Sequence, residues 1–318
     1  MTSATSPATP SAMPAAPARP SAGLLARLIA VPAIWGGTFI AGRLVAGNVP
    51  PSVGALLRYL FASVALWIAL RTMEGGLPRL SRRQWMVTAL LGATGIFGYN
   101  LFFFAALERL PASRTSLIIA MNPVVTIALS VLLLGDRLSP RRWAGVAVAL
   151  AGVWIVVSRG DVTGALSRAV GAGEAMMFAG VCMWAAYTLI GRAALKGLSP
   201  LAATTCASLW GTAMLGAVAA FDLARVPLSA YTFGVLASSA YLGLLGTAVA
   251  FVWYYQGVQR LGASRTVVFN NLVPVFGTAF GVTLLGEPLQ ASMLAGGAVA
   301  VAGVFLATWT PATIHKNC

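Results

Sequence analysis

The sequence predicts an all-α polytopic membrane protein, with ten transmembrane helices arranged as two inverted repeats of five helices each around a central cavity. The first observation is composition: 58% of the 318 residues are hydrophobic, only 9% are charged, and the mean hydropathy is +0.84. A soluble domain has about 25% charged residues. The second observation is an alternation of apolar runs with short polar breaks, and the third is an internal repeat. Ten helices of about 20 residues use roughly two thirds of the chain, so little remains for a domain outside the membrane.

The elements follow one another in order from a polar start. Residues 1–22 are rich in Ser, Thr, Ala and Pro, with Arg19 as the one charged side chain, and are expected to form a disordered cytoplasmic tail. The apolar run from Leu24 is too long for a signal-peptide core, so it is interpreted as a first, uncleaved spanning helix. The predicted helices cover residues 24–46, 52–71, 84–107, 112–134, 142–158, 173–193, 200–221, 232–256, 262–285 and 289–309. Gly, Pro or charged residues separate most of them, and a second cytoplasmic tail covers 310–318.

The basic residues predict the orientation of the chain. An even number of spans puts both termini on one side of the membrane. If that side is the inside, the inner segments hold 14 Lys and Arg residues and the outer segments hold 6. Because Lys and Arg collect in cytoplasmic loops, both termini are expected in the cytoplasm, with the chain in the inner (plasma) membrane of a prokaryote. The same bias explains the net charge of +14, so the expected surroundings are lipid, without a nucleic-acid partner.

The repeat divides the chain into residues 23–158 and 159–309. Residues 109–156 align without gaps on residues 260–307, at an offset of 151, with 22 identical positions among 48. The match includes the segments RLPASRT and RLGASRT, and it pairs Pro123 with Pro274. Since each half holds an odd number of helices, the second half must enter the membrane from the opposite side. Inverted repeats of this kind are typical of carriers that give alternating access to a site at the membrane midplane.

Several of these landmarks together resemble a known family. They are the Trp35-Gly36-Gly37-Thr38 start, Arg58 after Pro51, the two RLxASRT segments and the Gly-Asp and Gly-Glu ends of the repeats. Over residues 27–309 the chain resembles the drug/metabolite transporter superfamily, within it the EamA-type exporters, and among these it is similar to amino-acid exporters of the YddG type. The resemblance implies a basket in which helices 1–4 and 6–9 line a central cavity and helices 5 and 10 form a packing scaffold. One departure is that Ala207 stands where Arg58 would recur in the second half.

The candidate functional residues are polar or aromatic groups inside predicted spans. The candidate substrate-cavity residues are Trp35, Arg58, Tyr99, Asn100, Asn122, Trp184, Tyr187, Tyr254, Tyr255, Asn270 and Asn271. Arg58 either reaches the outer interface along its own stem or anchors a substrate carboxylate, and the amides either join helices or line the cavity. The candidate hinges are Gly36, Gly37, Gly95, Gly98, Pro123 and Pro274.

The residue inventory narrows the function. The one histidine lies in the C-terminal tail, the three cysteines have no metal-ligand spacing, and no Asp or Glu lies near the middle of a predicted span. We therefore expect no enzyme, no metal, no cofactor and no proton exchange through a buried acid. An aromatic cavity with a few amides indicates an exporter of small organic solutes, foremost aromatic and other neutral amino acids, working by alternating access and facilitated efflux. The alternatives are a multidrug or nucleotide-sugar exporter and a membrane sensor or scaffold. Monomer and homodimer both stay open.

Overall fold

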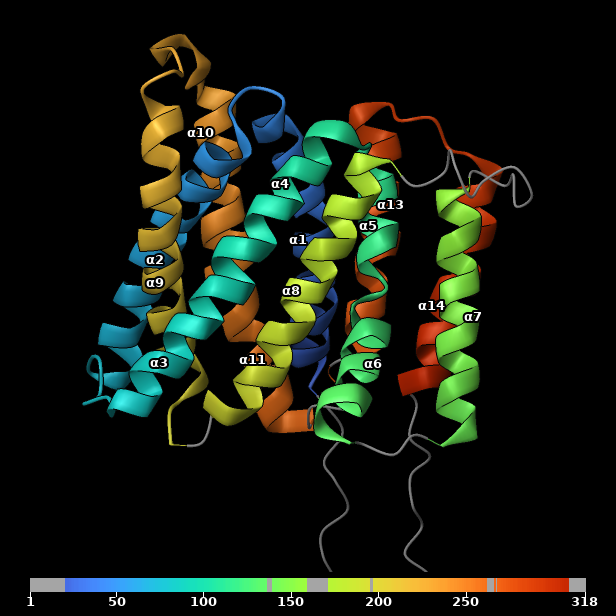
Figure 1. Cartoon of the computed structure of the whole chain (residues 1–318), viewed down its shortest axis with the longest axis horizontal. Coiled ribbons are helices and arrows are strands. Elements are labelled where there is room, and N and C mark those ends of the chain that lie inside the picture. Colours follow the sequence, from blue (N-terminus) through green and yellow to red (C-terminus); the bar gives the residue numbers. More distant parts are fainter. Residues whose placement is uncertain are drawn as a thin grey trace, which may run out of the picture.

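The computed structural model describes residues 21–135, 139–158, 171–194, 197–261, 266 and 268–308, and most of the two expected tails lies outside these ranges. Within them the chain forms helices and no β-strand, and the helices stand side by side in one bundle (Figure 1). Among the described residues, eight helices are long and apolar enough to cross a membrane, and the segments Phe269–Leu285 and Ala291–Ala307 are shorter apolar helices. The expected all-helical membrane fold is thereby confirmed.

The helices follow the order expected from the sequence. The first half contains α1 (Ala22–Ala46), α2 (Pro51–Glu74), α3 (Arg82–Leu91), the π-helix η1 (Gly92–Gly98), α4 (Tyr99–Arg109), α5 (Ala112–Ile119), α6 (Asn122–Leu134) and α7 (Pro140–Val157). The second half contains α8 (Ala172–Ala194), α9 (Pro200–Leu223), the 3-10 helix η2 (Leu228–Ala230), α10 (Phe233–Ala240), the π-helix η3 (Tyr241–Val249), α11 (Ala250–Leu261), the 3-10 helix η4 (Val268–Leu272), α13 (Val273–Leu285) and α14 (Ala291–Thr308).

Short-range chemistry explains where several helices begin and end. Ser81 and Gln84 form a capping box at the start of α3, in which each side chain accepts the backbone N–H of the other residue at 3.3 and 2.9 Å. Gly135 and Gly286 end α6 and α13 at φ values of 68° and 64°. Glycine adopts this left-handed conformation without the clash that a Cβ atom would cause, so the repeated Gly-Asp and Gly-Glu positions are helix stops.

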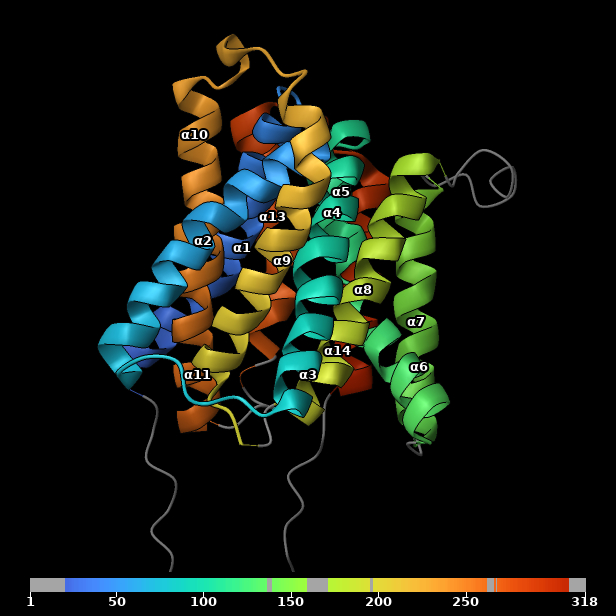
Figure 2. The ribbon, with the colours of Figure 1, turned by 60° about the vertical axis from the view of Figure 1, so that its left-hand side comes forward.

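Helices α2 and α9 pack against each other in antiparallel orientation. Ser52, at the start of α2, donates a hydrogen bond to Asp222 at the end of α9, and Ser199, just before the start of α9, donates to Glu74 at the end of α2 at 2.6 Å. Figure 2 shows the two helices side by side along most of their length. Each end of the pair is therefore joined by a hydroxyl–carboxylate bond, which is stronger than one between neutral groups.

Helices α7 and α14 form a close pair at one edge of the bundle (Figure 1). A Cβ atom on Gly152 would lie 2.2 Å from the backbone nitrogen of Ala300, and one on Gly303 would lie 2.2 Å from that of Ala149. Because small residues let helix backbones approach each other, glycines on both helices make this contact possible. The pair corresponds to helices 5 and 10 of the sequence analysis, and their role as a packing scaffold stays a prediction.

Two expected spans are interrupted at repeat-related positions. The run predicted over 112–134 divides into α5 and α6, with Pro123 in the first turn of α6. The run predicted over 262–285 contains η4 followed by α13, with Pro274 in the first turn of α13. Each proline lacks the N–H that an unbroken helix would need and fits the first helical turn. The interruptions therefore lie just before prolines that occupy the same place in the two halves.

Candidate functional site

The two π-helices lie at equivalent positions of the repeat. At the offset of 151, Gly92 of η1 corresponds to Gly243 of η3. A Cβ on Gly92 would lie 2.7 Å from the carbonyl oxygen of Ala207, and one on Gly243 would lie 2.5 Å from that of Arg58. Each π-helix thus touches the backbone of a helix from the other half of the chain. Such segments occur frequently at functional sites.

Side chains bind the backbone carbonyls of both π-helices. The indole Nε1 of Trp35 donates to the Gly246 oxygen at 2.9 Å, and the Thr247 hydroxyl donates to the Leu242 oxygen at 3.0 Å. In the first half, Asn100 donates to the Ile96 oxygen at 2.7 Å. The amide nitrogen of Asn100 is therefore engaged in its own helix, while its buried oxygen has no hydrogen-bond partner among the described residues.

The predicted aromatic residues form two groups. In the first, Tyr99 stacks on Phe103 at 5.8 Å between ring centroids and lies 5.1 Å from Trp184, which lies 5.3 Å from Tyr187. In the second, Trp35 lies 5.7 Å from Tyr254 and 6.0 Å from Phe251. Aromatic pairs at these distances attract one another beyond the burial of their surface. The side chain of Tyr255 lies outside the described part.

Arg58 lies at the junction of α2, η3 and α4 and is 7% exposed. Its Nη2 donates to the hydroxyl of Thr247 at 3.3 Å, and its guanidinium carbon lies 5.5 and 5.8 Å from the ring centroids of Tyr59 and Phe103. The side chain is buried and packed against aromatic rings. The groups that it meets are those of neighbouring helices, which favours a role inside the bundle over contact with the outer interface.

Buried amide oxygens mark both interrupted spans. The Oδ1 atoms of Asn122, at the start of α6, and of Asn270, in η4, are buried without a hydrogen-bond partner among the described residues. Asn271 follows in η4 and is partly buried. An unpaired polar atom in the hydrocarbon region costs free energy, so these oxygens are available to accept hydrogen bonds from a bound solute.

The candidate hinge glycines all take part in close packing. A Cβ on Gly36 would lie 2.6 Å from the Cβ of Phe276, one on Gly37 would lie 2.2 Å from the Tyr241 hydroxyl, and one on Gly95 would lie 2.3 Å from the ring of Tyr187. One on Gly98 would lie 3.0 Å from the sulfur of Met183. These contacts explain why glycine stands there, and the hinge role of these residues and of Pro123 and Pro274 stays a prediction.

Two acidic side chains hold one end of α5 against the second half of the chain. Glu287 accepts the backbone N–H groups of Ala112 and Ser113 at 2.7 and 2.9 Å, which satisfies donors that a helix start leaves free. Glu174, in the first turn of α8, forms an ion pair with Arg114 at 2.8 Å. The sequence reasoning did not identify this network. The repeated RLxASRT segment was the one signal in the sequence that pointed to its position.

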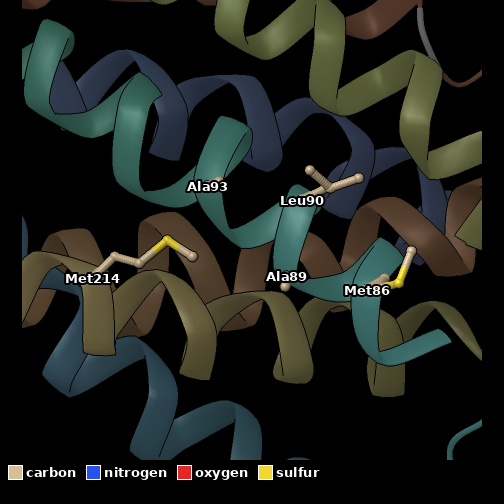
Figure 3. A pocket seen from close by; sticks show the side chains of 5 residues that line it. All are labelled: Met86, Ala89, Leu90, Ala93 and Met214. Carbon is tan, nitrogen blue, oxygen red and sulfur yellow. The ribbon is translucent and has the colours of Figure 1, made fainter. Parts of the chain in front are cut away.

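One apolar groove lies on the surface of the bundle between the α3–η1 segment and α9. It has a volume of about 320 Å³ and is lined by Met86, Ala89, Leu90, Ala93 and Met214 (Figure 3). None of the predicted cavity residues lines it, and Met86 and Leu90 are exposed. A groove of this composition suits lipid chains. The central cavity stays a prediction, and no group of three potential metal ligands occurs among the described residues.

Comparisons with known proteins agree with this architecture. A crystal structure with 21% sequence identity superimposes with a TM-score of 0.62, covering 90% of this chain and 98% of the other, which shows the shared fold. The uncharacterized transporter YyaM of Bacillus subtilis is 30% identical, over 86% of this chain and 89% of its own length. A probable terminal-alkyne amino-acid exporter of Streptantibioticus cattleyicolor is 31% identical over the same shares, 86% and 89%.

A third relative is the probable amino-acid metabolite efflux pump of Salmonella typhimurium, which is 26% identical over 89% of this chain and 93% of its own length. The EamA-like transporter family matches residues 22–158 and 171–309. These two matches coincide with the two helical halves that carry the repeated π-helices and interruptions. The chain is an integral membrane protein of the EamA-like transporter family.

Proposed function

We propose that the protein exports amino acids, foremost aromatic and other neutral ones, by alternating access and facilitated efflux. The observation that carries this proposal is the pair of interrupted helices, α5–α6 and η4–α13, which hold the buried oxygens of Asn122 and Asn270. Interrupted helices in corresponding places of two repeats are the strongest structural sign of the binding site in carriers of this kind.

The chemistry of these oxygens suits an ammonium group. An amide oxygen accepts hydrogen bonds, and an ammonium group has three N–H donors. A solute carrying an ammonium group would satisfy acceptors that the described helices leave without partners. The rings of Trp35, Tyr99, Trp184 and Tyr187 supply apolar surface for an aromatic or aliphatic side chain. Ammonium and apolar side chain together are features of a neutral amino acid.

Two relatives support the solute class. The Streptantibioticus cattleyicolor protein is named as a probable exporter of a terminal-alkyne amino acid, and the Salmonella typhimurium protein as a probable amino-acid metabolite efflux pump. Both match this chain over more than four fifths of its length. We therefore propose amino acids as the transported solutes, in preference to drug cations and nucleotide-sugars.

Ten spans and an inverted repeat are part of the proposal. The antiparallel α2–α9 pair supports it, as does the opposite course of α1, which rises in Figure 1, and α8, which descends. We expect a green fluorescent protein fused after Cys318 to be fluorescent, since that protein folds in the cytoplasm. Alkaline phosphatase inserted after Gly164 should be active, since it needs the periplasm. The reverse pattern would contradict the orientation.

Counterflow in proteoliposomes tests the transport reaction. Vesicles with purified protein and unlabelled L-phenylalanine inside should accumulate labelled L-phenylalanine without an imposed proton gradient, while a drug cation and a nucleotide-sugar should not exchange. Exchange of the cation alone would replace the proposal by multidrug export, and exchange only under a proton gradient would contradict facilitated efflux.

A substitution of Trp184 tests the first of the two aromatic groups, the one that contains Tyr99 and Tyr187. Trp184→Ala removes the ring that lies between Tyr99 and Tyr187. Counterflow of L-phenylalanine should fall by about two- to tenfold, since the aromatic pair that the solute ring would form with Trp184 contributes about 0.5–1.5 kcal/mol. Trp143→Ala, on the exposed face of α7, is the matched control and should exchange at the wild-type rate. Equal rates for the two variants would remove Trp184 from the site.

A further inference from the structure

Arg58 is a buried cation without an acidic partner in the described part of the chain. The ion pairs there join Arg109 to Glu108 and Arg114 to Glu174, and neither involves Arg58. A buried charge is costly unless an opposite charge and hydrogen bonds compensate it. The folded protein is therefore left with a guanidinium group that an anion would stabilise.

The guanidinium also has unused hydrogen-bond donors. It carries five N–H groups, and the described residues supply one acceptor, the Thr247 hydroxyl at 3.3 Å. The Nε atom is buried and has no hydrogen-bond partner among these residues. Thr247 itself donates to Leu242, so it can only accept from Arg58. A carboxylate is the group that the planar guanidinium binds best, through two parallel hydrogen bonds.

The other half of the chain shows that packing does not require an arginine at this place. Ala207 is the counterpart of Arg58, and its carbonyl approaches Gly92 as that of Arg58 approaches Gly243. Ile96 is the counterpart of Thr247 at the offset of 151. The same helix contact therefore has the apolar residues Ala207 and Ile96 in one half, where the other half has Arg58 and Thr247.

The surroundings of Arg58 connect it to the aromatic group of the candidate site. Phe103, 5.8 Å from the guanidinium carbon, stacks on Tyr99, and Tyr99 contacts Trp184. A positive group thus stands at one end of a row of aromatic rings. A solute that fits has a carboxylate at one end and an apolar body beside it.

We infer that Arg58, positioned by Thr247, binds the carboxylate of the transported solute. This assignment rests on the proposed function and adds that the carboxylate is a required recognition element. It predicts that 3-phenylpropionate, which lacks the amino group of phenylalanine, competes for the site, and that 2-phenylethylamine, which lacks the carboxylate, competes more weakly.

The test compares these two competitors in counterflow of labelled L-phenylalanine. In the wild-type protein, 3-phenylpropionate should inhibit at a concentration at least about tenfold lower than 2-phenylethylamine, because a ligand without a carboxylate leaves the buried guanidinium donors unpaired. Arg58→Gln should abolish this preference, and Arg58→Lys should keep part of it because the charge remains. Thr247→Val, which leaves the charge but removes its hydrogen-bond partner, should reduce the preference as well.

Ligand-induced shifts of the unfolding temperature separate the possible failures. If wild-type vesicles exchange no amino acid, the proposed function fails. A wild-type shift with 3-phenylpropionate that Arg58→Gln lacks would then still support the carboxylate site. If L-phenylalanine is exchanged and Arg58→Gln ranks the two competitors as the wild type does, the inference is overturned while the proposed function stands. If Arg58→Gln does not fold, the ranking by Arg58→Lys and Thr247→Val decides, and an unchanged preference in both overturns the inference.

Discussion

Glu174→Gln is expected to lower the free energy of unfolding by about 3–5 kcal/mol, the usual cost of removing one partner from a buried ion pair. The side chains of Arg114 and Glu174 are 8% and 9% exposed, and Arg114 also donates to the carbonyl oxygen of Val157 at 2.6 Å. The substitution would remove the carboxylate that the buried guanidinium contacts at 2.8 Å. Denaturant unfolding of the purified protein in one detergent measures the change.

The exposed pair Arg109–Glu108 is the matched control. Its side chains are 42% and 43% exposed, so Glu108→Gln should change the free energy of unfolding by about 0–1 kcal/mol. In the double variant Arg114→Met/Glu174→Met, most of the stability that Glu174→Gln removes should return, because a buried ion pair and an apolar pair of similar size are often equally stable. If Glu174→Gln and Glu108→Gln changed the free energy of unfolding equally, water would be compensating the charge of Arg114 that Glu174→Gln leaves behind.

Gly152→Ala is the second change with a large expected effect, about 1–3 kcal/mol of destabilisation from overpacking. The added Cβ would lie 2.2 Å from the backbone nitrogen of Ala300 and 2.6 Å from the carbonyl oxygen of Gly296. Both contacts are with backbone, so a side-chain rotation cannot relieve them, and α7 must move away from α14. The unfolding temperature in detergent should fall accordingly.

Gly216→Ala provides the comparison for a glycine inside a spanning helix. The nearest atom to a Cβ at this position is Cδ1 of Leu56 at 3.9 Å, which is ordinary contact. Alanine favours a helix over glycine by about 1 kcal/mol, so this variant should be as stable as the wild type or more so. If Gly152→Ala behaved in the same way, the close α7–α14 contact would not be the reason for glycine at position 152.

The candidate site was only partly predictable from the sequence. Trp35, Arg58, Tyr99 and Trp184 were identified because polar and aromatic groups inside apolar spans are unusual. Their partners were not, since Thr247 lies 189 residues from Arg58 and Gly246 lies 211 residues from Trp35. Phe103 was not among the candidate residues, because it lies in an apolar run of its helix and nothing in the sequence indicated that it packs against Arg58.

The π-helices were missed for a different reason. Their hydrogen bonds span one residue more than those of an α-helix, and this difference leaves no distinct hydropathy period in a helix that is apolar all round. The glycines of η1 and η3 were a visible signal, but the sequence reasoning interpreted Gly95 and Gly98 as hinges. In the structure, Gly92 and Gly243 mark where a neighbouring backbone comes close.

The sequence by itself determined that the chain lies in a membrane, which stretches of it are apolar enough to span, and that its two halves are related. Lipid demands a minimum length, an apolar surface and internally satisfied backbone groups, and these demands can be read residue by residue. Only the tertiary structure decided which faces of the helices meet. In lipid the faces that pack and the faces that meet hydrocarbon are both apolar, so hydropathy could not distinguish the buried surroundings of Arg58 from the outside of the bundle.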